Sequence, residues 1–194
     1  NSGQMYPDAV AGLYGFGAIA LALYHRDRTG AGQFIDMSMQ EANFTFLGER
    51  WLEYVLTGTV PGPMGNHHPS FAPHGIYPCS GDDKWVAIAV ETDDQWRSLC
   101  SVSGRAEWLD QFTGDRKVRE DALDGEIAGW TAAMKRDVLV ERLSSVGVIA
   151  APVLNALEVA HDPVFRERCA IRMIDHPETG YWPQPAIPCH FAAT

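Results

Sequence analysis

Apolar residues near the start of the chain recur with the spacing of a helix. We expect this helix to begin at Pro7 and Asp8, because the proline restricts the backbone and the aspartate can cap free amide groups. Its basic end at residues 25–28 suits the helix dipole, and the glycines of residues 29–32 stop it. The apolar positions are Val10, Leu13, Tyr14, Phe16, Ile19, Ala20 and Leu23. They cover more than one face, which predicts a helix buried on most of its circumference.

The pattern then changes twice before a flexible stretch. Residues 33–39 alternate briefly between apolar and polar side chains, as in a short strand, and residues 40–56 return to a helical spacing. Residues 57–69 contain three prolines and three glycines, the densest such stretch in the chain. We expect a domain boundary there.

Beyond this boundary the pattern predicts a mixture of strands and helices. Two strands at residues 75–79 and 85–90 are joined by a hairpin turn at residues 80–84. Proline-rich residues 177–188 are expected to hold no regular element. Between these regions the pattern predicts helices at residues 93–102, 119–130, 135–146 and 156–161, the last stopped by Pro163, and an apolar strand at residues 148–153.

Composition narrows the class of protein. Of the 194 residues 46% are hydrophobic, enough for one sizeable core or two small ones, and the net charge of −10 disfavours nucleic acids and anionic membranes as partners. The longest uncharged apolar run, residues 9–24, is shorter than the roughly 20 residues that span a bilayer. Four separated cysteines (Cys79, Cys100, Cys169 and Cys189) are expected to be buried thiols of a reducing compartment, which favours the cytoplasm. The chain does not start with methionine, and we expect it to be part of a longer protein.

Asp8 is the first candidate for chemistry. A carboxylate at the amino terminus of an apolar helix stays ionised and exposed to a ligand, although most aspartates at such positions are only caps. Gly12, Gly15 and Gly17 would let a helix or a flat ligand lie close to the backbone. Their order is the reverse of a dinucleotide-binding loop and no strand precedes them, so they are weak evidence for one.

The second candidate is the segment of residues 65–74, which holds three histidines. They could ligate a metal, but nothing in the sequence fixes a ligand geometry. The segment could instead be a mobile lid hinged at Gly62 and Gly65, or a plain surface linker. The sequence lacks a G-x-S-x-G elbow, a Walker loop and an H-E-x-x-H motif, which argues against serine and nucleotide hydrolysis.

Several of these stretches together resemble the class III CoA-transferase family, the group of formyl-CoA transferase and carnitine dehydratase. The resemblance covers nearly the whole chain, but only as the latter part of a protein about twice as long. It rests on Asp8-x-x-x-Gly12, ALYHRDRTGAGQFIDMSMQEA at residues 22–42, Gly65-Asn66-x-His68-Pro69, residues 72–77, 81–90, 95–96 and 147–153, and Asp162-Pro163.

The resemblance implies a fold and an activity. It implies an α/β fold in which residues 1–57 are part of a large Rossmann-like domain, residues 58–72 a linker or lid, residues 73–176 a small α+β domain, and residues 177–194 a returning linker. The family's nucleophile stands 22 residues before the glycine of the Arg-Thr-Gly turn, which selects Asp8. This carboxylate would carry CoA between an acyl-CoA thioester and a carboxylic acid through an aspartyl anhydride and an aspartyl-CoA thioester.

Partners and alternatives also follow from the resemblance. It implies an interlocked homodimer, or pairing with the absent amino-terminal part that holds most CoA contacts; CoA is a substrate rather than a bound cofactor. Asn66, His67 and His68 are candidate lid residues, but this chain has His68-Pro69-Ser70-Phe71 where some relatives have a run of glycines. Three alternatives stay open: an α-methylacyl-CoA racemase, in which the aspartate acts as an acid/base; a noncatalytic or truncated assembly subunit; and a metal hydrolase.

Overall fold

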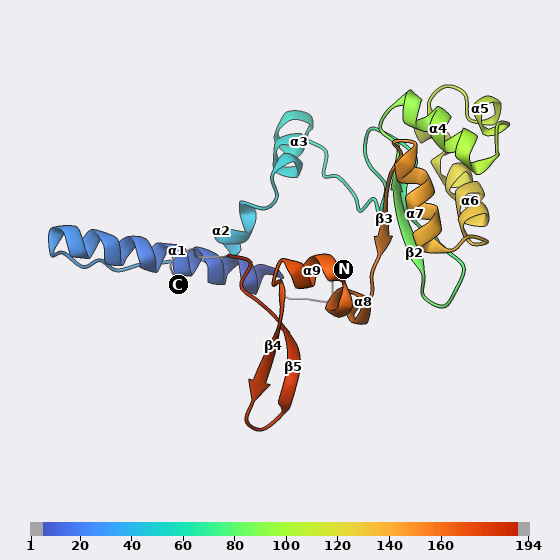
Figure 1. Cartoon of the computed structure of the whole chain (residues 1–194). Coiled ribbons are helices and arrows are strands. Elements are labelled where there is room, and N and C mark those ends of the chain that lie inside the picture. Colours follow the sequence, from blue (N-terminus) through green and yellow to red (C-terminus); the bar gives the residue numbers. More distant parts are fainter. Residues whose placement is uncertain (1–5, 190–194) are drawn as a thin grey trace. The chain divides into compact units, whose positions relative to one another are not determined.

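A computed structural model describes residues 6–189 and shows a mixed α/β fold of helices and small antiparallel sheets (Figure 1). The chain divides into two compact units between Pro63 and Met64. The expected α/β class is therefore confirmed. The expected terminal segments include residues 1–5 and 190–194, which lie outside the described residues.

Over residues 6–63 the first unit contains three helices: α1 (Tyr6–Thr29), α2 (Met39–Phe44) and α3 (Glu49–Thr57). α2 packs against α1, where Val10 and Ala11 meet Ala42. The Tyr14 and Thr45 hydroxyls lie 2.9 Å apart, and the Phe46 ring meets Tyr14 edge-on. The predicted end of α1 is confirmed, since Gly30 adopts a left-handed φ of 74° and its N–H binds the Arg26 carbonyl.

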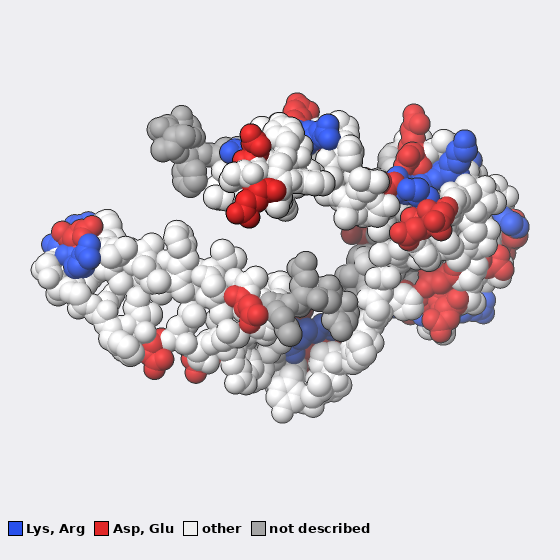
Figure 2. All heavy atoms as spheres, turned by 90° about the horizontal axis from the view of Figure 1, so that it is seen from below, with Lys and Arg blue, Asp and Glu red and all other residues white. Residues whose placement is uncertain are grey.

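α1 is far less covered than its pattern predicts. Within it Val10 and Ala11 are buried, whereas Leu13 and Phe16 are 73% and 75% exposed. The charged residues of α1 are Asp8 near its start and Arg26, Asp27 and Arg28 at its end, where Figure 2 shows a patch of blue and red side chains. The expected burial is wrong for this chain, because α2 covers only one side of α1.

Two local predictions for the first unit are also wrong. No strand forms at residues 33–39, because no described residue of this unit offers a neighbouring strand for hydrogen bonding. The single helix predicted over residues 40–56 is broken into α2 and α3. The break ends at Gly48, whose φ of 48° a right-handed helix cannot contain.

The second unit is built on an antiparallel sheet in the order β1-β2-β3, formed by β1 (His74–Pro78), β2 (Trp85–Ala89) and β3 (Ile149–Val153). The turn at residues 80–84 makes the predicted hairpin, with Ile76 opposite Ala87 and Ala87 opposite Ala151. The helical elements between β2 and β3 are α4 (Asp93–Ser103), α5 (Trp108–Gln111), the 3-10 helix η1 (Arg116–Arg119), α6 (Glu120–Thr131) and α7 (Arg136–Ser145).

The core of this unit lies on one face of the sheet. Alternate side chains of β1 and β2 point towards the helices, and the residues between them point away. α6 packs on β1, and α7 packs on β2 and β3. The fully or almost fully buried residues shared by these elements are Tyr77, Val86, Ile88, Leu99, Leu123, Ile127, Leu139 and Leu143.

The last part of the described chain holds α8 (Ala156–His161), α9 (Pro163–Glu167) and the hairpin of β4 (Ile171–His176) and β5 (Gly180–Pro185). Pro163 opens α9 as well as ending α8, because a proline needs no partner for its nitrogen in a first turn. The expectation of an irregular tail is wrong. Pro183 and Pro185 are accepted because they lie two residues apart on an edge strand, where alternate nitrogens point away from the partner.

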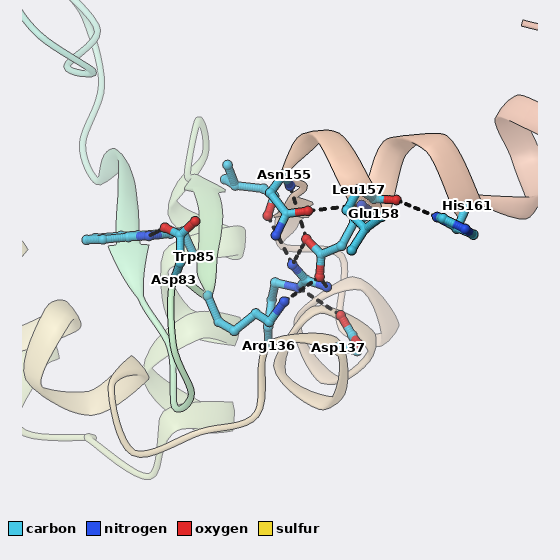
Figure 3. Close-up of polar contacts among 10 residues, drawn as sticks. Asp83, Trp85, Arg136, Asp137, Asn155, Leu157, Glu158 and His161 are labelled. Carbon is cyan, nitrogen blue, oxygen red and sulfur yellow. Dashed lines mark hydrogen bonds and ion pairs between the residues drawn. The ribbon is translucent and has the colours of Figure 1, made fainter. Parts of the chain in front are cut away.

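A buried arginine fastens α8 to the sheet unit (Figure 3). Arg136 Nη1 and Nη2 each donate to the Glu158 carboxylate, at 2.9 and 3.0 Å. Lys84 donates to the same carboxylate, and Arg136 Nη1 also donates to the Val153 carbonyl at 3.0 Å. Arg136 is only 8% exposed, so these contacts replace its hydration.

The same contacts shift the pKa values of the pair. Hydrogen bonds from Arg136, then Lys84, then the Asn155 backbone lower the pKa of Glu158 from 4.5 to about 2. Glu158 raises the pKa of Arg136, although burial opposes this shift. A carboxyl group with a lowered pKa in the folded state stabilises the fold above the pKa of the unfolded state, and this contribution is lost on acidification.

Replacing Glu158 tests this anchor. We expect Glu158→Gln to lower the urea midpoint at pH 7, because Arg136 loses its charged acceptor. The difference from the wild type should shrink as the pH falls from 4.5 towards 2, where Glu158 itself becomes protonated. Asp94→Asn is the matched control, since it removes an exposed pair with Arg97 inside one helix and should change little. A constant difference across this pH range would contradict the assignment.

Candidate functional site

Asp8 lies in the first turn of α1 and is exposed. Its carboxylate makes no hydrogen bond or ion pair with another described residue. The free N–H groups and the dipole at the start of a helix stabilise negative charge at such a position. The structure therefore places Asp8 where an anionic side chain is available to a ligand.

The glycines that follow Asp8 leave space along α1. A methyl group added at Gly12 or Gly17 would meet no described atom within 4 Å, and at Gly15 it would touch Met37 at an ordinary 3.5 Å. Gly12 is one helical turn after Asp8 and therefore lies on the same face. The absence of a side chain at Gly12 leaves the approach to the carboxylate open.

The segment of residues 64–74, called here the crossover segment, is fastened to the second unit. Arg116 Nε donates to the Ala72 carbonyl at 2.8 Å, and the Val90 N–H donates to the Pro73 carbonyl at 2.9 Å. His74 Nδ1 lies 2.5 Å from the Asn66 carbonyl oxygen. These contacts hold both halves of the segment against the sheet unit.

His67 makes the contacts of this segment with the acidic start of α6. Its Nε2 lies 2.7 Å from Asp124 Oδ2, and its Nδ1 lies 3.2 Å from Glu120 Oε2. Tyr77 donates its hydroxyl proton to Asp124 Oδ1 at 2.6 Å, and Lys117 binds Glu120. Burial and the Asp124 carboxylate raise the pKa of Tyr77, so the phenol stays protonated. The sequence suggested His67 as a lid residue, but its ring binds α6.

The other two predicted lid residues are placed differently. The His68 ring stacks on Phe71 at 3.6 Å between centroids, and His68 Nδ1 accepts the Ser70 N–H. The Asn66 side chain is exposed and makes no hydrogen bond to a described residue. Of the three, Asn66 thus has the side chain most open to a ligand.

A pocket of about 380 Å³ lies on the outer face of the sheet beside the crossover segment. Small side chains form its floor, because Ala87, Ala89 and Ala151 occupy outward positions of β2 and β3. Ile76 and Ile149 add apolar walls, and the polar lining comes from Asn66, His67 and His74. An apolar hollow with a few polar groups at one side suits a small organic group.

Two of the four cysteines are buried, and the described part of the chain holds no cluster of metal-binding side chains. Cys79 and Cys100 are buried, and burial raises the pKa of both thiols, to about 11 for Cys100. Cys169 and Cys189 are exposed, which corrects the expectation that all four are buried. Within residues 6–189 no three metal-binding side chains come together.

Sequence reasoning missed the residues that hold the crossover segment. Glu120 and Asp124 are one turn apart at the start of a predicted helix, and this spacing was the available signal. Nothing in the sequence linked them to His67 or Tyr77, which are 57 and 47 residues away from Asp124. The network of Arg136 and Glu158 was also missed.

By length and composition α1 is the one helix of the described chain that could cross a membrane. A single helix of this kind near the start of a chain is weak evidence. A solved structure of a CaiB/BaiF family protein from Brucella suis matches 99% of the chain at a TM-score of 0.87 and 32% identity. α1 therefore lies inside the fold shared with that protein.

The chain is also similar in sequence to CoA-transferases from other organisms. The chain is 30% identical to a probable CoA-transferase of Mycobacterium tuberculosis over 196 aligned positions, covering 95% of the chain and 24% of the relative. It is 31% identical to succinyl-CoA:mesaconate CoA-transferase of Haloarcula marismortui, covering 82% of the chain and 40% of that enzyme. It covers 50% of the Brucella suis protein. The chain thus spans half or less of the length of each of these proteins.

The family signature described as "CoA-transferase family III" matches residues 1–194. The match covers both units, the Asp8 helix and the crossover segment. The chain therefore belongs to CoA-transferase family III.

Proposed function

We propose that the protein carrying this chain transfers CoA between an acyl-CoA thioester and a carboxylic acid, with Asp8 as the nucleophile. The observation that carries the proposal is the exposed Asp8 carboxylate in the first turn of α1, with open space at Gly12 beside it. Family membership and the CoA-transferase relatives support the reaction class. Dipole stabilisation favours the ionised form that attack requires.

The reaction proceeds by two exchanges at the Asp8 side chain. The carboxylate oxygen attacks the thioester carbonyl carbon, the C–S bond breaks, and a mixed anhydride and CoA thiolate result. The thiolate then attacks the aspartyl carbonyl carbon, which releases the donor acid and leaves an aspartyl-CoA thioester. The acceptor carboxylate displaces CoA to form a second anhydride, and the returning thiolate takes the acceptor acyl group and frees Asp8.

Both intermediates hydrolyse, so water must be kept from Asp8 during the cycle. We propose the crossover segment as the lid for this purpose, with Asn66, whose side chain is exposed, as a substrate-contacting residue. The sheet pocket beside this segment is the candidate binding site for a short carbon chain, since its lining is apolar with polar groups on one side. His67 and His68 support the segment through Asp124 and Phe71.

We also propose a domain organisation and an oligomeric state for the whole protein. Residues 1–57 belong to a large Rossmann-like domain, residues 58–72 connect, residues 73–176 form a small α+β domain, and residues 177–194 return. The whole enzyme works as a homodimer in the cytoplasm and uses CoA as a substrate. The exposed apolar side chains of α1 and α3 fit the need for further protein surface against them.

Replacing Asp8 tests the nucleophile directly. We expect Asp8→Asn in the intact protein to lower kcat by about 10³-fold or more, because an amide cannot form the anhydride. Rates are measured with succinyl-CoA and a panel of dicarboxylic acids, the substrate type named for the Haloarcula relative. Asp27→Asn, at the other end of α1, is the matched control and should keep its rate.

Trapping gives the same test a chemical readout. Hydroxylamine added during turnover should convert Asp8 to a hydroxamate, which mass spectrometry locates in its peptide. A mark on another residue, or full activity of Asp8→Asn, would refute the nucleophile. Exchange of the α-proton of a 2-methylacyl-CoA with deuterated water, without any acceptor acid, would identify a racemase instead.

A second prediction concerns the space at Gly12. We expect Gly12→Val to lower kcat/KM by about tenfold or more, since the new side chain crowds the approach to Asp8. Its melting temperature should not fall, because no described atom lies within 4 Å of the added Cβ and valine suits a helix better than glycine. Gly129→Val in α6 is the control, with equally open surroundings. A parallel loss of stability and activity at Gly12 would indicate packing rather than substrate access.

A further inference from the structure

The two ring nitrogens of His67 face two carboxylates at the start of α6. Each ring nitrogen faces a carboxylate oxygen, Nε2 that of Asp124 and Nδ1 that of Glu120. An ionised carboxylate only accepts hydrogen bonds, and a neutral imidazole donates from one nitrogen only. The contact with Asp124 is a hydrogen bond, whereas the contact with Glu120 is an ion pair that forms when the ring is protonated.

The charges around the ring support this state. His67 and Lys117 bring two positive charges, and Glu120 and Asp124 bring two negative charges, so the cluster is neutral with His67 protonated. Glu120 is only 7% exposed, and its Oε1 atom has no protein partner. The buried charge of Glu120 is therefore stabilised by its ion pairs with Lys117 and His67, because an uncompensated buried charge is costly.

Tyr77 fixes the position of Asp124 from the other side. Its hydroxyl binds Asp124 Oδ1, so the two oxygens of this carboxylate point to Tyr77 and His67 respectively. The Tyr77 ring lies over Gly75, where an added Cβ would come within 2.8 Å of the hydroxyl oxygen. Glycine at position 75 thus leaves room for the Tyr77 ring. The Tyr77 hydroxyl then fixes the orientation of the Asp124 carboxylate that His67 contacts.

We propose that His67 is a positioning residue, which clamps the crossover segment onto α6 through a hydrogen bond between Nε2 and Asp124 and an ion pair between Nδ1 and Glu120. The clamp sets the place of its neighbour Asn66 at the rim of the sheet pocket. The contact between His74 Nδ1 and the Asn66 carbonyl oxygen also holds Asn66 in place. The part of this proposal that concerns catalysis rests on the proposed CoA transfer.

The first experiment measures the clamp without any substrate. Hydrogen exchange of the peptide that covers residues 64–74 is followed by mass spectrometry in the intact protein. His67→Gln keeps a polar side chain but cannot carry the positive charge that pairs with Glu120. We expect this peptide to exchange about tenfold faster, as for the loss of a charge-assisted hydrogen bond. His161→Gln is the matched control, because that ring binds only the Leu157 carbonyl of its own helix.

A charge-balanced double variant separates the clamp from general instability. His67→Gln leaves the cluster with one uncompensated negative charge, and His67→Gln/Asp124→Asn restores neutrality. The amide oxygen that Asp124→Asn introduces can still accept the hydrogen bond from Tyr77. We expect the double variant to recover part of the lost protection, and to be closer to the wild type than either single variant. Lack of any recovery would overturn the role of the charge balance.

The second experiment measures positioning in the proposed reaction. We expect His67→Gln to raise the KM for the acyl-CoA about tenfold and to leave kcat within about twofold, since it displaces a rim of the substrate site and not the nucleophile. A fall in kcat as large as the rise in KM, together with a lower melting temperature, would show that His67 has only a structural role. Unchanged exchange of residues 64–74 would overturn the clamp itself. If the wild type transfers no CoA, the proposed function fails, whereas the exchange result still decides the clamp.

Discussion

The small sheet of the second unit has two faces, and the helices between β2 and β3 pack on only one of them. Tyr77, Val86 and Ile88 fill the covered face, so the residues that alternate with them must point the other way. On the outer face these are mainly alanines and isoleucines, which leave a shallow apolar pocket. The site described for this unit follows from that one constraint. The crossover segment enters beside β1 and borders the pocket because β1 begins at His74.

The carboxylates discussed above fall into two kinds, those paired with other side chains and Asp8, which is unpaired among the described residues. Arg136 and His67 bind carboxylates from distant parts of the sequence, and both contacts tie an outlying segment to the sheet unit. Asp8 has neither a cation nor a hydrogen bond from a described side chain, and only the start of a helix stabilises its charge. A carboxylate that is ionised but not engaged is the form in which a side chain can act as a nucleophile.

The elements with strong local signals were predicted well. The β1–β2 hairpin and the helices α4, α6, α7 and α8 lie within a residue or two of their predicted bounds, because capping residues and turn glycines act locally. The predictions failed where neighbours decide. Residues 33–39 have strand alternation but no strand beside them, and Pro183 and Pro185 fit a strand only because it is an edge. The apolar pattern of α1 indicated burial, but a sequence pattern does not identify the protein surface that would cover the helix.

The sequence alone indicated the family and singled out Asp8 as the candidate nucleophile. These follow from motifs that lie within a few residues of one another, such as Asp8-x-x-x-Gly12 and the turn at Gly30. Only the tertiary structure decided what the histidines of the crossover segment do. The partners of His67 lie more than 50 residues along the chain, and it is the packing of α6 on β1 that brings Asp124 to within 2.7 Å of its ring. No local pattern can report a distance that depends on how two remote elements pack.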